Sequence, residues 1–250
     1  GDFVTDVSIQ AEEHSLLELV SEDLRFLKEH PSSIMTSPQL IWAMIKSQGV
    51  TTGYVPGFGR VPIYNLFSRG NAVTGGRRIV GHLEGIKSVV DGIKLQAQGN
   101  LTGLQVPLLV GTHGTGKTEF RSVIANALAH FSRNDPKFFM YEISWKVDEL
   151  QNIPDLSEYV KTCQETEMPS PLHSSPVSIL PDSFKRALKK HAQRIVAEEI
   201  GDEFPAFDME ADPISQSIRD SILRYFRLGG EVVDGILGEL DIRRQEDGSF

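Results

Sequence analysis

The chain has 250 residues, 40% of them hydrophobic and 24% charged, which is the composition of an ordinary globular protein. Its 25 Lys and Arg against 34 Asp and Glu give a formal net charge of −9. This balance disfavours nucleic acid as a partner, because contacts to phosphates need surplus cations. Cys163 is the only cysteine, so neither an intramolecular disulfide nor a cysteine metal cluster can form.

The sequence contains neither a membrane helix nor the pattern of a secretory leader. No apolar run approaches the roughly 18 residues that a membrane helix needs. The first residues, GDFVTDVS, carry acids in place of the basic and then apolar order of a signal peptide. We therefore expect a cytoplasmic protein with no membrane partner, and a single cysteine fits such a reducing compartment.

The first part of the chain predicts two helices and a connector. Residues 10–30 carry Leu and Val at helical spacing with acids between them, and residues 38–49 form a second helix. Residues 50–76 are rich in glycine and proline with scattered aromatics, which indicates a loop with one short strand. We expect residues 1–70 to form an N-terminal helical extension and connector.

Residues 79–145 alternate between helix and strand. Residues 79–97 have helical periodicity, LQVPLLVG (104–111) is a short buried strand, residues 117–131 are a strong helix, and FFMYEISW (138–145) is a second buried strand. A strand, a glycine loop, a helix and a second strand form one βαβ unit. This order favours a parallel sheet.

The remainder of the chain is mostly helical after an irregular start. Residues 151–183 contain five prolines and predict irregular structure. A helix with a basic first half follows over residues 183–200, then an acidic loop over 201–213 and another helix over 214–228. We expect one more strand near the end of the tail.

The stretch GTHGTGKT (111–118) matches the phosphate-loop pattern G-x-x-x-x-G-K-[ST] at each fixed position: Gly111, Gly116, Lys117 and Thr118. Many proteins match this pattern by chance. Here a buried strand precedes the loop and a helix follows it, as the mechanism requires. The alternative is a glycine turn that only joins the strand to the helix. This alternative does not explain why a lysine, Lys117, occupies the start of the helix.

The residue types of this loop suit phosphate chemistry. Successive backbone N–H groups and the helix N-terminus form an anion hole for phosphate oxygens. Lys117 brings a positive charge to the β- and γ-phosphates and is the catalytic residue that we assign, and the Thr118 hydroxyl can bind Mg²⁺. His113 either donates to phosphate or fills a variable position. We expect ATP and Mg²⁺ as cofactors, held by Gly111, Thr112, His113, Gly114, Thr115, Gly116, Lys117 and Thr118.

The stretch IVGHLEGI (79–86) lies about 30 residues before the loop. An apolar pair, a glycine and then a helix resemble the start of many P-loop ATPases of the AAA+ class, in which the backbone near this glycine lies against the adenine. The resemblance implies a base pocket lined by Ile79, Val80, Gly81 and His82. The alternative is a plain helix start with two core residues.

Several stretches in a set order resemble the N-terminal AAA domain of the PrkA family, whose members are described as serine protein kinases. They are HPSSIMTSPQLIWAMIKSQGV, PIYNLFSRGNAVTGGRRIVGHLEGI, the phosphate loop, FFMYEISW and SPLHSSPVSILP, and together they cover most of residues 20–200. The last stretch has the family's proline-framed pattern at Pro171, His173, Pro176, Leu180 and Pro181.

The resemblance implies an α/β fold, with a P-loop AAA+-type parallel sheet, flanking helices and an N-terminal helical extension. Residues 71–250 would be the nucleotide-binding domain. It would be cut short on its C-terminal side, because the family's chains are far longer and carry a kinase-like module further on. The resemblance also implies an ATP-dependent serine protein kinase or AAA+ ATPase, a protein substrate or partner, and assembly into a homo-oligomer.

Two features depart from the family's pattern. The loop GTHGTGKT is poorer in glycine than the family's usual loop, and no apolar strand ends in the acid expected to anchor Mg²⁺, the Walker B acid. AFDMEAD (206–212) is the nearest candidate, and LGELDIRR (237–244) has the wrong order of features. A second hypothesis is therefore a nucleotide-gated binding or oligomerisation module without chemistry of its own. A DNA-remodelling ATPase is disfavoured by the net charge.

Other chemistry-bearing residues support a site less well. His173 lacks a second ligand at metal spacing and Cys163 lacks a neighbouring base, so we interpret both as structural. The basic run over residues 185–194 faces phosphates or an acidic partner, or else is a solvated helix face. Arg243 and Arg244 are candidates for an arginine that reaches the nucleotide of a neighbouring subunit.

Overall fold

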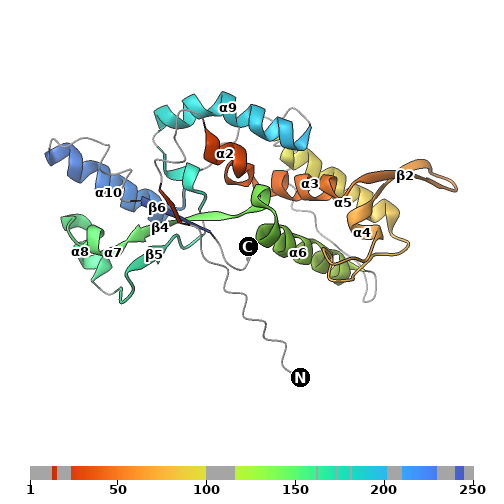
Figure 1. Cartoon of the computed structure of the whole chain (residues 1–250), viewed down its shortest axis with the longest axis horizontal. Coiled ribbons are helices and arrows are strands. Elements are labelled where there is room, and N and C mark those ends of the chain that lie inside the picture. The colour runs from red at the N-terminus through yellow and green to blue at the C-terminus, as the bar shows by residue number, and fades with distance from the viewer. Residues whose placement is uncertain are drawn as a thin grey trace, which may run out of the picture. The chain divides into compact units, whose positions relative to one another are not determined.

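The computed structural model describes residues 13–15, 24–99, 116–161, 163–172, 174–180, 182–201, 210–229 and 240–244 (Figure 1). The chain divides into two compact units, each assembled from segments far apart in the sequence. The first contains residues 1–26, 140–181 and 209–250, and the second contains residues 27–139 and 182–208. Residues from both sides of position 70, where the sequence predicted a domain boundary, belong to the second unit.

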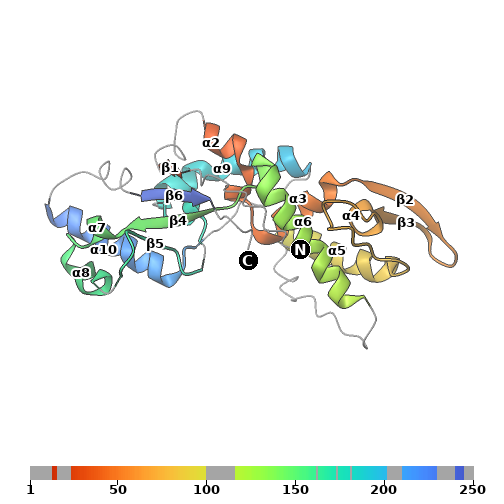
Figure 2. The same ribbon diagram turned by 60° about the horizontal axis from the view of Figure 1, so that its bottom comes forward.

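A four-stranded antiparallel sheet is the main element of the first unit (Figure 2). Its order is β1 (Glu13–Ser15), β6 (Leu240–Arg244), β4 (Tyr141–Lys146) and β5 (Glu167–Pro169). Five consecutive residues of β4, from Tyr141 to Trp145, are buried. Two of the five are polar: Glu142 and Ser144 alternate with the apolar Tyr141, Ile143 and Trp145, so both faces of this strand are buried.

Short helices and one long helix complete the first unit: α7 (Val147–Leu150), α8 (Pro154–Val160), η4 (Pro176–Ile179) and α10 (Pro213–Gly229). The 3₁₀ helix η4 packs on β4, and α10 contacts both α8 and η4. All four residues of η4 are buried. The later part of the proline-framed stretch is therefore in the core of this unit, whereas Pro171 and Leu172 at its start are exposed.

The second unit is largely helical and contains the β2–β3 hairpin. Its elements are α2 (Arg25–Glu29), in which the boundary between the units falls, η1 (Pro31–Ile34), α3 (Ser37–Ser47), β2 (Val50–Val55), β3 (Gly59–Tyr64), α4 (Asn65–Ser68), α5 (Leu83–Ala97), α6 (Lys117–Asn134), η3 (Pro136–Phe138) and α9 (Asp182–Ile200). Helix α3 contacts α5, α6 and α9. Its start is a capping box, in which the Thr36 N–H donates to Gln39 Oε1 at 2.9 Å.

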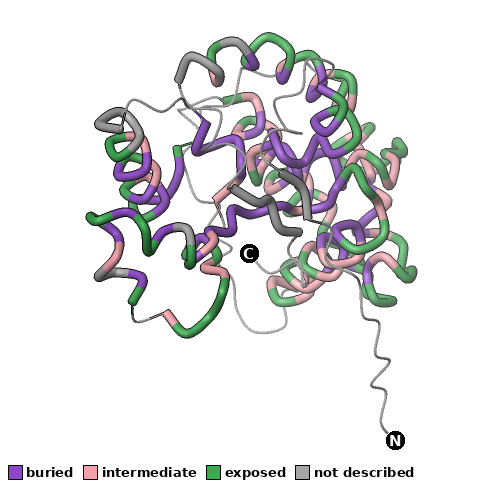
Figure 3. The backbone as a smooth tube through the Cα atoms, turned by 60° about the vertical axis from the view of Figure 1, so that its left-hand side comes forward, coloured by how far each residue is buried: buried purple, intermediate pink, exposed green. Residues whose placement is uncertain are grey.

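Helix α9 is amphipathic. Leu188, Ala192, Ile195 and Val196 are buried at helical spacing, and Figure 3 shows buried and exposed residues alternating along this helix. This periodicity is the signal that predicted the helix from the sequence. Among the described residues, no helix has both the length and the apolar content to cross a membrane.

The structure confirms the predicted mixture of helix and strand, and five predicted helices have counterparts in α3, α5, α6, α9 and α10. Residues 13–15, predicted as helix, are instead a strand because they pair with β6. Residues 50–76, predicted as a loop with one strand, contain the β2–β3 hairpin and α4.

The predicted direction of the sheet is not found. β4 runs antiparallel to both of its neighbours, β5 and β6, because its partners come from the proline-rich region and from the tail and not from a βαβ crossover. The strand expected over residues 104–111 lies outside the described residues. A parallel sheet is not seen among the strands that the structure describes.

Candidate functional site

The start of α6 carries the end of the predicted phosphate loop. Gly116 immediately precedes the helix in the left-handed conformation, with φ of +79°, and its carbonyl accepts the N–H of Phe120 at 2.8 Å. Lys117 and Thr118 are the first two helical residues. A glycine suits this turn because L side chains rarely adopt positive φ. Residues 111–115 of the predicted loop lie outside the described residues.

The local geometry fits a phosphate group and its metal ion. The N–H groups of a first helical turn have no acceptor within their own helix, and together with the helix dipole they favour an anion. Lys117 is half-buried and Thr118 is exposed at this end of an 18-residue helix. An ammonium and a hydroxyl are the donor and ligand that phosphate and Mg²⁺ require.

The segment from Phe67 to His82 runs along the first half of α6. The rings of Phe67 and Phe120 stack with centroids 4.9 Å apart and planes 10° apart. Farther along the helix, Asn126 Nδ2 donates to the Thr74 carbonyl at 3.1 Å. These contacts place the segment with the predicted base-binding stretch beside α6, the helix that follows the predicted phosphate loop.

Thr74 organises the turn in this segment. It is fully buried, and its Oγ1 donates to the Arg77 carbonyl at 2.7 Å and accepts from the Asn71 N–H at 3.2 Å. The Thr74 N–H donates in turn to Asn71 Oδ1 at 3.2 Å. The turn also brings Arg77 to the first turn of α6, where Arg77 Nη1 lies 2.8 Å from Glu119 Oε2.

The four residues of the predicted base pocket take different positions. Ile79 is buried, and its N–H donates to the Phe67 carbonyl at 2.7 Å. Val80 is exposed, and Gly81 has φ of +86° with open space where a side chain would be. His82 precedes α5, and its Cδ2 lies 3.6 Å from the position that a Cβ on Gly116 would take. His82 and Gly116 are far apart in the sequence but lie close together in the structure.

Sequence reasoning missed the residues that join this segment to α6. Glu119 follows the loop motif directly, and acids are common in a first helical turn, so its presence carried little information. Arg77 lies 42 positions from Glu119 and Asn126 lies 52 positions from Thr74. No local spacing predicts such pairs, because they form only when the segment folds back onto the helix.

Asp212, the last acid of the nearest Walker B candidate, caps α10 in the first unit. Its Oδ1 accepts the N–H groups of Ile214 at 3.0 Å and Ser215 at 2.9 Å, and its Oδ2 accepts Ser170 Oγ at 2.7 Å and Ser174 Oγ at 2.8 Å. Burial acts to raise the pKa of this carboxyl, but hydrogen bonds from Ser215, Ser170 and Ser174 outweigh it and hold the pKa well below its usual range. Both oxygens are thus engaged in hydrogen bonds to the start of α10 and to Ser170 and Ser174.

The arginine candidates and the basic run lie on regular elements. Arg243 stands opposite Glu142 of β4 and Glu13 of β1 in the sheet register, and Arg244 stands opposite Tyr141. On α9 the basic run forms an exposed face that includes Arg186, Lys189, Lys190 and Arg194. Cys163 is partly exposed, and His173 lies outside the described residues.

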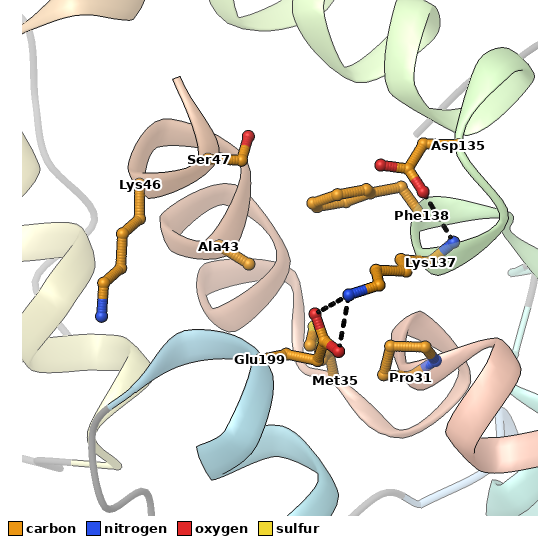
Figure 4. Close-up of a pocket in the computed structure, with 9 residues that line it drawn as sticks. All are labelled: Pro31, Met35, Ala43, Lys46, Ser47, Asp135, Lys137, Phe138 and Glu199. Carbon is orange, nitrogen blue, oxygen red and sulfur yellow. Dashed lines mark hydrogen bonds and ion pairs between the residues drawn. The ribbon is translucent and has the colours of Figure 1, made fainter. Parts of the chain in front are cut away.

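A hollow of about 400 Å³ lies in the second unit beside α3 (Figure 4). Lys137 Nζ lies 2.9 Å from both carboxylate oxygens of Glu199 at its rim, and Asp135 Oδ1 accepts the Lys137 N–H. The charges of Lys137 and Glu199 are therefore paired with each other. The residues that line it are Pro31, Met35, Ala43, Lys46, Ser47, Asp135, Lys137, Phe138 and Glu199.

No protein-family model, curated protein or solved structure matches this chain. Among the described residues, no group of three or more His, Cys, Asp or Glu side chains is placed to hold a metal ion. The start of α6, with the segment from Phe67 to His82 beside it, is therefore the candidate site that the geometry favours.

Proposed function

We propose that this protein binds Mg-ATP at the start of α6. The observation that carries the proposal is the left-handed Gly116 followed by Lys117 and Thr118 at the first two positions of a long helix. In this proposal the loop amides of residues 111–116 and the Lys117 ammonium hold the phosphates. The Thr118 hydroxyl binds the Mg²⁺, which neutralises charge on the phosphate oxygens when bound.

The neighbouring segment supports the proposal. His82 lies against Gly116, and Phe67 stacks on Phe120, so the stretch with the predicted base-pocket residues is packed beside the phosphate end of the helix. The exposed backbone around Gly81 would then be available to the base. This arrangement would let one ligand contact the helix start with its phosphates and the segment with its base.

The class of reaction is proposed from the motif resemblance. A PrkA-like AAA+ serine protein kinase would use Mg-ATP for phosphoryl transfer to a protein substrate, or for hydrolysis. Lys117 is the residue that we assign to stabilising the charge of the transferred group. A cytoplasmic location would supply the nucleotide.

The environment of Asp212 favours a second candidate function. Both of its oxygens accept hydrogen bonds within the first unit, so this acid is poorly suited to anchor a metal ion. Without such an acid, a nucleotide-gated binding or oligomerisation module would bind ATP without turning it over. The two candidates share the binding step and differ in the chemistry that follows.

Binding and turnover by one preparation test both candidates. Calorimetry with Mg-ATP should detect binding to the wild-type protein, and Lys117→Ala should weaken it about ten- to hundredfold, the loss expected for a charge-assisted hydrogen bond. Thr118→Val should reduce the dependence of binding on Mg²⁺. Lys189→Ala, which removes the same charge from the exposed face of α9, is the matched control and should leave binding unchanged.

The outcomes separate the hypotheses. Phosphate release that is lost in Lys117→Ala supports the enzyme, and binding without release supports the nucleotide-gated module. Competition with GTP identifies the preferred base. A wild-type protein that binds neither ATP nor GTP overturns both proposals.

A further inference from the structure

We propose that β2 is the contact strand of a homodimer, in which the β2 strands of two copies pair antiparallel around a two-fold axis at Thr52. The strand lies in a hairpin that extends past α4 and α5 of its own unit (Figures 1 and 2). The proposal does not depend on nucleotide binding. It rests on the backbone pattern, exposure and composition of this strand.

The backbone pattern of the hairpin leaves one row of β2 groups facing outward. The Asn65 N–H donates to the Gly49 carbonyl at 3.1 Å, just before the β2–β3 register begins at Val50 opposite Tyr64. Residues of an antiparallel strand alternately turn their backbone groups toward the partner and away from it. Since Gly49 faces the β3 side, the even positions that follow it, Val50, Thr52 and Tyr54, turn their N–H and C=O groups to the outer edge.

The position of Pro62 agrees with this pattern. Pro62 stands opposite Thr52 and has no N–H, so this pair belongs to the class that exchanges no hydrogen bonds across the hairpin. Pro62 also removes a donor from the outer edge of β3. That strand contacts α5, and a hollow of about 600 Å³ lies between the hairpin and α5. Pro62 and the contact with α5 therefore make the outer edge of β3 less suited to pairing than that of β2.

The outer edge of β2 has none of the features that usually protect an edge strand. Residues 50–55, VTTGYV, contain no charge and no proline, and among the described residues the hairpin is a sheet of two strands only. Val50 is 45% exposed and Tyr54 is 75% exposed. An uncharged strand with open backbone groups and exposed apolar side chains is a template for pairing with another chain.

The strand is complementary to itself. With Thr52 opposite its own copy, Val50 stands opposite Tyr54 of the other copy, and these outward-facing residues can exchange both N–H···O bonds. Val50, Thr52 and Tyr54 share one face of the strand because side chains alternate with a period of two. The two exposed apolar side chains then cover each other on both sides of the axis. Because the strand is uncharged, a suitable partner strand is also uncharged, and the β2 strand of a second copy is such a partner.

The expected dimer is weak, because one strand pair buries less area than the about 1,200 Å² of a stable interface. Sedimentation velocity of the whole chain from about 1 μM to 1 mM should show a concentration-dependent monomer–dimer equilibrium. Thr52→Lys places like charges opposite each other at the axis and should raise the dimer Kd about tenfold or more. Thr52→Glu should do the same.

Mixing the two variants is the decisive arm. Thr52→Lys and Thr52→Glu together should form a heterodimer with a Kd near the wild-type value, because the opposing residues then carry opposite charges. Ser88→Lys adds the same charge at an exposed position of α5 and should leave the Kd unchanged. Thermal unfolding followed by circular dichroism checks that each variant folds. If Thr52→Lys does not fold, Tyr54→Lys serves as a second variant that should disrupt the dimer.

A wild-type chain that stays monomeric up to about 1 mM overturns the proposal. So does a dimer whose Kd is unaffected by both charges at position 52, or a mixture that associates no better than the separate variants. Each of these outcomes would assign the open edge of β2 to an extended segment of another protein or to no partner.

Discussion

Arg77 Nη1 lies 2.8 Å from Glu119 Oε2, which joins the segment before α5 to the first turn of α6. Both side chains are partly exposed, at 48% and 33%, so the pair adds little to the stability of the fold. Its position matters more than its strength. Glu119 places a negative charge two residues after Lys117, where phosphate is proposed to bind, and Arg77 balances that charge.

Removal of Arg77 should therefore act on ligand binding more than on folding. We expect Arg77→Ala to weaken Mg-ATP binding about two- to fivefold, because an unbalanced carboxylate near the phosphates costs about 0.5–1 kcal/mol. Glu119→Gln in the same background should restore the affinity. Calorimetry on the wild type, both single variants and the double variant measures this coupling. Equal weakening by Arg77→Ala in both backgrounds would contradict a role through Glu119.

Gly116→Ala should destabilise the protein. The positive φ of +79° at this position costs an L residue about 1–2 kcal/mol. The added methyl would stand 3.6 Å from His82, an ordinary contact, so the cost comes from the backbone conformation. Gly85→Ala is the matched control, because Gly85 lies inside α5 with open space around it, and there alanine should stabilise by about 0.5–1 kcal/mol. Urea unfolding measures the change in the free energy of unfolding, which should be negative for Gly116→Ala and positive for Gly85→Ala. A stabilising Gly116→Ala would contradict the left-handed conformation of Gly116.

Asp212 should make stability depend on pH in the acid range. Its pKa in the folded protein is depressed, with burial opposed and outweighed by hydrogen bonds from Ser215, Ser170 and Ser174. A depressed pKa means that the stabilisation is present above the unfolded pKa of about 3.9 and is lost as pH falls below it toward the folded pKa.

Asp212→Asn should lower the free energy of unfolding at pH 7 by about 1–3 kcal/mol, because the amide cannot accept all four hydrogen bonds. The difference between this variant and the wild type should shrink as the pH falls below about 4. Urea unfolding at a series of pH values measures it. A difference that stays constant with pH would show that the charge of Asp212 does not contribute.

Thr74→Val should destabilise the turn that carries Arg77. Valine keeps the shape but removes the hydroxyl that bonds the Arg77 carbonyl and the Asn71 N–H. Two backbone groups in part-buried hydrogen bonds then lose this partner, at a cost of about 1 kcal/mol. Thr74→Ser keeps the hydroxyl and should cost less. Chemical unfolding ranks the three proteins, and a serine variant less stable than the valine variant would assign the role of Thr74 to its methyl group.

The local elements near the proposed site could be predicted from the sequence, because their signals are local. The apolar stripe after GTHGTGKT predicted α6, and the glycine before Lys117 predicted a turn that other residues avoid. The mostly apolar stretch FFMYEISW predicted β4 as a buried strand, and the structure also buries the two polar residues within it, Glu142 and Ser144. Helical periodicity does not detect a short strand such as β1, whose conformation comes from pairing with β6.

By itself, the sequence indicated most of the long helices, their apolar faces, and which residues are candidates to hold phosphate, since side-chain spacing and backbone preference act over a few positions. Only the tertiary structure decided that β4 pairs antiparallel with β5 and β6, that His82 meets Gly116, and that Asp212 is engaged by serines. These relationships join residues far apart in the chain. They depend on which surfaces are buried together when the whole chain folds, and that choice leaves no periodic pattern in the sequence.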